Sequence, residues 1–125
     1  YPPTDTSKFQ YQEAEQCAAS PESLLLGFNV MKNPEKGYEN SPVSKVTKEA
    51  PPFLIIHGTN DRTVPFSQSE SLYESLEKNG CDVTFLALEG ADHADLQFFQ
   101  DEVWERMISF FKEKLTRICE ENIKN

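Results

Sequence analysis

The sequence is poor in positive charge. Its 125 residues include 12 lysines and arginines against 21 aspartates and glutamates, so the net charge is −9. A chain this acidic repels phosphate backbones, and it has no cluster of lysines and arginines with which to bind an anionic membrane surface. We therefore expect neither a nucleic acid nor a membrane as a partner.

Cysteine and glycine are also scarce. Cys17, Cys81 and Cys119 form no CxxC pair and have no activating pattern beside them, so they are interpreted as ordinary buried or helical thiols. There is no Gly-rich phosphate loop, no HExxH and no other metal-ligand spacing, so we expect no cofactor and no metal. Apolar runs such as Phe53–Ile56 are far shorter than the roughly 20 residues of a membrane-spanning helix.

The residues that are present suit one folded domain. Nine phenylalanines, four tyrosines and one tryptophan argue against disorder. A chain of this size buries roughly two thirds of its extended surface on folding, which is enough for a core.

One short helix is predicted over residues 21–26. Ser20 is a good N-cap, Pro21 suits the first helical position, and Gly27 can end the helix. We expect Leu24–Leu26 to supply its buried face.

The rest of residues 1–52, which contain seven of the eight prolines, is expected to form loops and short helices. A further helix is predicted within 8–18. Another helical turn can begin at Asn33–Lys36, and Ser41 with Pro42 would break it.

Residues 53–118 predict a strand, a helix, a strand and a helix in that order. Phe53–Ile56 is a continuous apolar run bounded by two prolines before it and by His57 and Gly58 after it, which is typical of a strand buried on both faces. The other expected elements are a helix over 66–79, a strand over Val83–Leu88 and an amphipathic helix over about 96–118. We expect the apolar stripe of the last helix to pack against the sheet.

A strand–helix repeat with short connections implies parallel strands in an open α/β sheet. Only two strands are clear, although a third could end at Tyr1. So small a sheet leaves an edge of unpaired backbone groups. We expect the sheet to continue in residues outside this sequence or in another chain, and we expect homo-oligomers to form through the open edge.

A polar segment follows each predicted strand. Asp61 lies in the first segment and His93 in the second, and sites in open α/β sheets form at the carboxyl ends of strands. An aspartate there can hold an imidazole in one tautomer and stabilise the imidazolium. Asp61 and His93 are therefore candidates for the acid and the base of a nucleophilic triad.

Three other polar residues have competing interpretations. Asp92 adjoins His93 on one loop and is poorly placed to face its ring. His57, next to Gly58 at the strand end, is interpreted as a structural residue that bridges loop backbones. Asp5 could line the pocket, but the cap of a helix is its favoured role.

The nucleophile of such a triad is missing from the sequence. In this type of sheet the serine lies in a G-x-S-x-G elbow between a strand and a helix. No two of the five glycines are four residues apart, so the elbow is absent.

Residues 41–93 resemble the C-terminal half of α/β-hydrolase-fold esterases, and in particular the BD-FAE-like acetyl and feruloyl esterases. The resemblance is carried by APPFLIIHG, an aspartate three residues after Gly58, VPFSQSE and a Gly-x-x-His motif. Upstream, YPPTD, SPESLLLG and NPEK resemble the same group, so the resemblance covers about residues 1–115.

The resemblance implies an α/β fold that is the C-terminal part of an α/β-hydrolase parallel sheet. Asp61 would be the triad acid and His93 its base, while the serine and the oxyanion hole would come from an N-terminal half absent from this sequence. The implied function is hydrolysis of carboxylic esters, with a small-molecule or polysaccharide-linked acyl ester as substrate. One departure is Ala94, where the group often has glycine.

Two alternatives stay open. Serine peptidases of the prolyl oligopeptidase type resemble the same motifs, although SPESLLLG and NPEK favour the esterases. The chain could also be a non-catalytic fragment that associates with itself.

Overall fold

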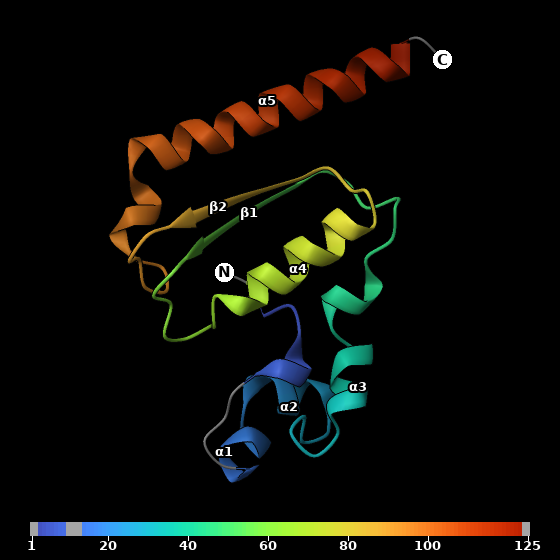
Figure 1. The fold of residues 1–125 in the computed structure, drawn as a ribbon, viewed down its shortest axis with the longest axis vertical. Helices are drawn as coiled ribbons and strands as arrows, with labels where there is room; N and C mark the ends of the chain where they lie inside the picture. The colour runs from blue at the N-terminus through green and yellow to red at the C-terminus, as the bar shows by residue number, and fades with distance from the viewer. Residues whose placement is uncertain (1–2, 10–13, 124–125) are drawn as a thin grey trace.

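The structure, a computed structural model, describes residues 3–9 and 14–123, with the side chains of the last helix described as far as Thr116 (Figure 1). Short helices make up the first part of the chain. They are η1 (Thr6–Lys8), α1 (Ala14–Ala18), α2 (Pro21–Leu26), α3 (Pro34–Glu39) and η2 (Pro42–Lys45).

The second part contains the strands and the longer helices. Its elements are β1 (Phe53–Gly58), α4 (Ser67–Lys78), β2 (Val83–Leu88), η3 (Leu96–Phe99) and α5 (Asp101–Ile123). The order strand, helix, strand is the predicted one. No helix of the described residues is both long enough and apolar enough to cross a membrane.

The two strands pair in parallel, as the sequence predicted. Phe53 lies opposite Val83 at one end of the pair, and Gly58 lies opposite Leu88 at the other. Helix α4 makes the connection and lies on one side of the strands, while α5 lies on the other (Figure 1). The strand that was expected to end at Tyr1 falls outside the described residues.

The hydrophobic core lies between the strands and α4. Its buried centre is Ile55 of β1 with Leu72 and Leu76 of α4. Partly buried side chains surround this centre, among them Phe53, Val83 and Phe85. Burial of α4 against both strands holds their carboxyl ends side by side, which is where the candidate site lies.

The helix predicted over 21–26 has the expected ends. The Ser20 side chain accepts a hydrogen bond from the backbone N–H of Ser23, and Gly27 ends the helix with φ 75°. The expected buried face is wrong, because the side of Leu24 and Leu25 faces solvent, and Leu25 is 85% exposed. The inward position belongs to Ser23, whose hydroxyl accepts a hydrogen bond from the backbone N–H of Val30 at 3.3 Å.

The helix predicted over about 96–118 has a different start. Leu96–Phe99 form a separate 3₁₀ helix, and α5 begins at Asp101 and reaches Ile123. The apolar spacing continues through both elements, so periodicity alone did not reveal the break at Gln100. The Asp95 side chain caps the 3₁₀ helix by accepting from the backbone N–H of Leu96.

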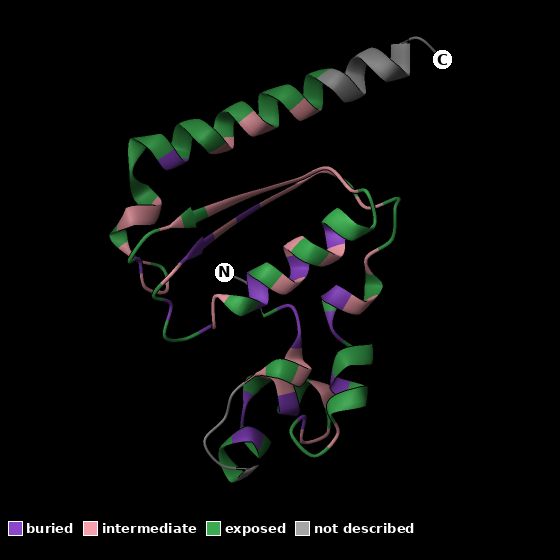
Figure 2. Ribbon diagram, viewed as in Figure 1, coloured by how far each residue is buried: buried purple, intermediate pink, exposed green. Residues whose placement is uncertain are grey.

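The expectation that this stripe packs against the sheet is also wrong. Of its described side chains only Val103 is buried, and Met107 and Phe110 are partly buried. Leu96, Phe99, Phe111 and Leu115 are exposed, and Figure 2 shows most of α5 as exposed. A two-stranded sheet is too narrow to cover a helix of this length.

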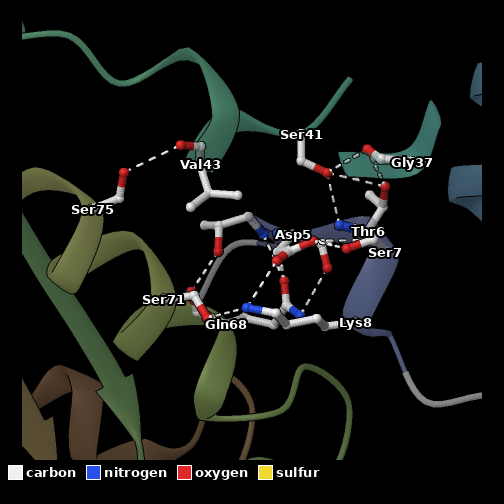
Figure 3. A network of polar contacts seen from close by, with 11 residues as sticks. Asp5, Thr6, Ser7, Lys8, Gly37, Ser41, Val43, Gln68, Ser71 and Ser75 are labelled. Atoms are coloured by element: carbon white, nitrogen blue, oxygen red, sulfur yellow. Dashed lines mark hydrogen bonds and ion pairs between the residues drawn. The ribbon is translucent and has the colours of Figure 1, made fainter. Parts of the chain in front are cut away.

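A buried glutamine joins the N-terminal segment to α4 (Figure 3). The side-chain oxygen of Gln68, Oε1, accepts from the backbone N–H groups of Thr4 and Asp5 at 2.9 and 2.7 Å, and its side-chain nitrogen, Nε2, donates to the backbone carbonyl of Asp5 at 3.0 Å. The Asp5 side chain accepts from the backbone N–H of Ser7 and so caps η1. The N-cap role expected for Asp5 is therefore confirmed.

The remaining helix predictions are confirmed in part. Of the range 8–18, Ala14–Ala18 is helical, and residues 10–13 lie outside the described residues. The turn expected at Asn33–Lys36 is the start of α3, and a 3₁₀ helix starts at Pro42 after the predicted break. The helix expected over 66–79 runs from Ser67 to Lys78.

Gly58 allows the two loops after the strands to approach each other. A Cβ atom at this position would lie 2.7 Å from the carbonyl carbon of Ala91 and closer still to its oxygen. We expect Gly58→Ala to lower the free energy of unfolding by about 3 kcal/mol, because the obstacle is backbone and cannot move aside as a side chain can.

Urea unfolding of the two variants Gly58→Ala and Gly27→Ala checks this expectation. Gly27 has φ 75° but open space around it, so alanine there should cost only about 1 kcal/mol of backbone strain. Equal losses in the two variants would contradict the close approach at Gly58.

Candidate active site

The loops that follow β1 and β2 are joined by three hydrogen bonds. The Thr59 backbone N–H donates to the Leu88 carbonyl at 2.9 Å, and the Asn60 N–H donates to the Ala91 carbonyl at 3.0 Å. The Gly90 N–H donates to the Thr59 hydroxyl at 2.8 Å. The two loops therefore form one platform at the carboxyl ends of the strands.

Asp61 and His93 meet on this platform. The Asp61 Oδ2 atom lies 2.8 Å from the His93 Nδ1 atom, with the carboxylate fully buried and 29% of the imidazole exposed. The other oxygen, Oδ1, accepts from the backbone N–H groups of Thr63 and Val64 at 2.9 and 2.7 Å. The sequence predicted that these two residues would share this edge, and the structure brings them together.

The environment of Asp61 favours its ionised form. Burial alone would raise the pKa of this carboxyl group, but hydrogen bonds from Val64 N–H, His93 and Thr63 N–H outweigh burial, and the pKa lies below its ordinary value. An ionised acceptor at 2.8 Å places the proton of the imidazole on Nδ1 of His93. The second ring nitrogen, Nε2, is then the one that can accept a proton.

A second histidine contacts the same carboxylate. His57 is fully buried, and its Nε2 atom lies 3.1 Å from Asp61 Oδ2 and 3.0 Å from the Val64 carbonyl oxygen. Its Nδ1 atom lies 2.6 Å from the Ser69 hydroxyl at the start of α4. The ring contacts loop backbone at Val64, as a structural role would require, but sequence reasoning missed the contact with Asp61, because no local pattern of the sequence indicates it.

The Asp92 carboxylate is engaged by Arg62 and by the backbone of His93. Its two oxygens accept from the backbone N–H and the Nε atom of Arg62 at 3.0 and 2.6 Å, and a guanidinium Nη2 also contacts the carboxylate. The backbone N–H of His93 donates to Asp92 at 2.8 Å. Asp92 thus ties the Asp61 loop to the His93 loop, and it does not compete with Asp61 for the ring.

The family of the chain follows from a match over more than half of its length. The BD-FAE family model matches residues 1–76. The chain belongs to the BD-FAE family. The match includes Asp61 and ends before His93, so the position of His93 at the site rests on the geometry described above.

Three comparisons show which proteins this BD-FAE chain is similar to. Esterase LipC of Mycobacterium tuberculosis is 37% identical over 73 residues, which are 58% of this chain and 18% of LipC. The probable isoprenylcysteine alpha-carbonyl methylesterase ICMEL1 of Arabidopsis thaliana is 31% identical over 84 residues, or 67% of this chain and 17% of ICMEL1. A truncated carbohydrate esterase from gut microbiota has a TM-score of 0.77 at 30% identity, over 91% of this chain and 40% of that one.

These similarities confirm the α/β fold class and the resemblance to α/β-hydrolase esterases. The chain spans less than a fifth of LipC and of ICMEL1. It spans two fifths of the gut carbohydrate esterase. The BD-FAE chain therefore corresponds to only part of the proteins it resembles.

Three local findings concern Ala94, the metal-binding side chains and the cysteines. Ala94 has φ 53° and is the one non-glycine residue of the described part with a positive φ, which explains why a glycine is favourable there. No group of three or more metal-binding side chains among the described residues is arranged to hold an ion. Cys17 and Cys81 are free thiols.

The pairing of Asp92 with Arg62 predicts an unusual titration. Hydrogen bonds from the backbone and the side chain of Arg62 lower the pKa of the Asp92 carboxyl group from 3.8 to about 2. Because the folded pKa lies below the unfolded one, the stabilisation is fully present above pH 3.8 and is lost as the pH falls through about 2.

A carbon-13 titration of the Asp92 carboxyl group measures this directly. We expect a midpoint near 2, which Arg62→Ala moves back toward 3.8. Arg106→Ala, which removes an arginine of α5, is the matched control and should leave the midpoint unchanged. A midpoint near 3.8 in the unmodified chain would contradict the pairing.

Proposed function

We propose that this chain supplies the acid and the base of a serine esterase. The observation that carries the proposal is the 2.8 Å contact between the buried Asp61 carboxylate and Nδ1 of a half-buried His93. The names of two relatives support the proposal, because LipC is an esterase and ICMEL1 a probable methylesterase.

In the proposed chemistry His93 takes up one proton and gives it away in each of two stages, acylation and deacylation. A serine hydroxyl attacks the acyl carbon of the ester while Nε2 of His93 takes the hydroxyl proton. His93 then gives that proton to the departing alcohol, and a water molecule hydrolyses the acyl-enzyme by the same route. Asp61 stays ionised throughout, holds the proton of His93 on Nδ1 and stabilises the imidazolium. These steps use no cofactor and no metal.

The serine and the oxyanion hole are assigned to an N-terminal half of the same fold. The sequence has no G-x-S-x-G elbow, and the chain spans only part of its relatives. The division of the chain into a helical segment 1–52 and a strand-containing segment 53–118 then describes part of one domain. This half is the first partner that we propose.

We expect this half to pack against α5 and against the face of β2 that is turned toward α5. A cavity of about 440 Å³ lies between them, lined by Leu86 and Leu88 of the strand and by Val103 and Arg106 of the helix, among others. The exposed apolar side chains of α5 form a stripe that consists of Trp104, Ile108, Phe111 and Leu115. Exposed apolar residues at this spacing along a helix indicate a surface that packs against another element.

The proposed substrate is an acyl ester, either a small molecule or an acyl group linked to a polysaccharide. A protein of similar structure is a carbohydrate esterase, and a protein of similar sequence is a probable methylesterase. Both names specify an ester bond, but they differ in the alcohol part of the substrate. A peptidase of the prolyl oligopeptidase type is the alternative for the same triad. The esterase names among the relatives favour ester hydrolysis.

The test measures hydrolysis of p-nitrophenyl acetate by residues 1–125, alone and with an N-terminal half that bears the nucleophile. This half is taken from the polypeptide that contains the chain or from a BD-FAE relative. We expect activity only in the mixture. Asp61→Asn should lower kcat by about 10⁴, because the imidazole adopts the wrong tautomer. Glu89→Gln, which changes an exposed carboxylate on the same platform, is the matched control and should keep full activity.

The single tryptophan reports whether the two halves associate. Trp104 is 47% exposed, and its emission should shift to shorter wavelength when the stripe on α5 is covered. Trp104→Phe, mixed in the same way, corrects for tryptophans of the other half. A mixture that shows the shift and hydrolyses no ester would contradict the esterase and favour the peptidase. A shift of the chain alone that depends on its concentration would favour the self-associating fragment.

A further inference from the structure

The strongest feature that the proposed chemistry leaves unused is His57. The side chain is fully buried, it is one of only two histidines in the chain, and it contacts the same oxygen of Asp61 as His93 does. The ring also packs edge-on against Phe66, with ring centres 5.6 Å apart. A buried imidazole with this many fixed neighbours has one defined orientation.

The hydrogen-bond partners of His57 determine where its proton lies. The Val64 carbonyl oxygen, 3.0 Å from Nε2, can only accept, and so can the ionised Asp61 oxygen at 3.1 Å. Nε2 must therefore carry a proton, which it shares between these two acceptors. Burial disfavours the imidazolium and lowers the pKa of His57, so the ring is neutral and Nδ1 has no proton. Nδ1 then accepts the hydroxyl proton of Ser69 at 2.6 Å.

These assignments give a directed chain of hydrogen bonds from α4 to the catalytic platform. The Ser69 hydroxyl donates to His57, His57 donates to Asp61 Oδ2, and His93 donates to the same oxygen from the other side. Ser69 is fully buried on α4, which packs against both strands, so this series of hydrogen bonds begins at a rigid position. The platform is in this way tied to the core.

We infer that His57, held by Ser69, is a positioning residue that aims the Asp61 carboxylate at His93. The inference rests on the proposed function, because it deepens the role of Asp61. His57 exchanges no proton with substrate, since its two nitrogens are turned to Ser69 and to Asp61. Its N–H is the donor to Oδ2 that comes from the core side, opposite His93, while the backbone N–H groups of Thr63 and Val64 hold only the other oxygen.

The first test reads the proton positions by nitrogen-15 NMR of the histidine side chains. Residues 1–125 labelled with ¹⁵N-histidine, assembled with an unlabelled N-terminal half, show only the two histidines of interest. We expect neutral His57 with the proton on Nε2 at pH 7. Ser69→Ala should move the Nδ1 signal further from that of a hydrogen-bonded nitrogen and leave the tautomer unchanged. A proton on Nδ1 of His57, or an imidazolium, would overturn the inference.

The second test separates positioning from stability. Gln can place an N–H near the position of Nε2, whereas Leu fills the space without a donor. We expect His57→Leu to lower kcat by about 10- to 100-fold with KM unchanged, which is the effect of losing one hydrogen bond to a charged group. His57→Gln should recover most of this loss, although both variants lose the bond to Ser69.

Unfolding curves of the two variants provide the control. If Leu and Gln are equally active at equal urea midpoints, His57 is only structural and the inference is overturned. The NMR result requires neither a substrate nor any turnover. A failed ester assay with the expected tautomer would therefore contradict the proposed function and leave the hydrogen-bond chain standing, so the two failures are distinguishable.

Discussion

The site depends on one buried carboxylate. Removing a charge from water is costly unless hydrogen bonds replace the lost hydration, and Asp61 has four such partners. Two backbone N–H groups satisfy Oδ1, and the two histidines of the chain satisfy Oδ2. The donors come from β1, from the loop that follows it and from the loop after β2. A carboxylate at this point therefore fixes three segments relative to one another.

The connection between the two loops does not rest on Asp61 alone. Arg62 and Asp92 join the same loops on the solvent side, where each is at least partly exposed. Gly58 permits the close approach of Ala91 on the inner side. An exposed ion pair contributes little stability. Its role at this site is to hold the backbone of His93 at a fixed distance from the Asp61 loop.

The sequence was sufficient to predict the features that depend on local or general rules. The parallel pairing of Phe53–Gly58 with Val83–Leu88 follows from the strand–helix–strand order, and the meeting of Asp61 with His93 follows from their positions after those strands. The ends of α2 follow from Ser20 and Gly27. Such features need only neighbouring residues or a single rule of topology.

The predictions that were wrong or missing concern contacts between side chains that no local pattern of the sequence determines. Leu25 and Phe111 have the spacing of buried residues, but periodicity cannot say whether a partner covers that side. The contact of His57 with Asp61 and Ser69 depends on side-chain directions that the sequence does not contain. The chain corresponds to two fifths of a related structure, and the N-terminal half that we propose would cover the exposed side of α5.

The most direct test of the central claim is the histidine nitrogen-15 spectrum of Asp61→Asn, recorded beside that of the unmodified chain. Because both imidazoles donate to the same oxygen, the account predicts that the signals of His57 and His93 change together and that His93 loses its preference for a proton on Nδ1. A spectrum in which only one histidine responds would show that Asp61 is not their common acceptor and would contradict the account.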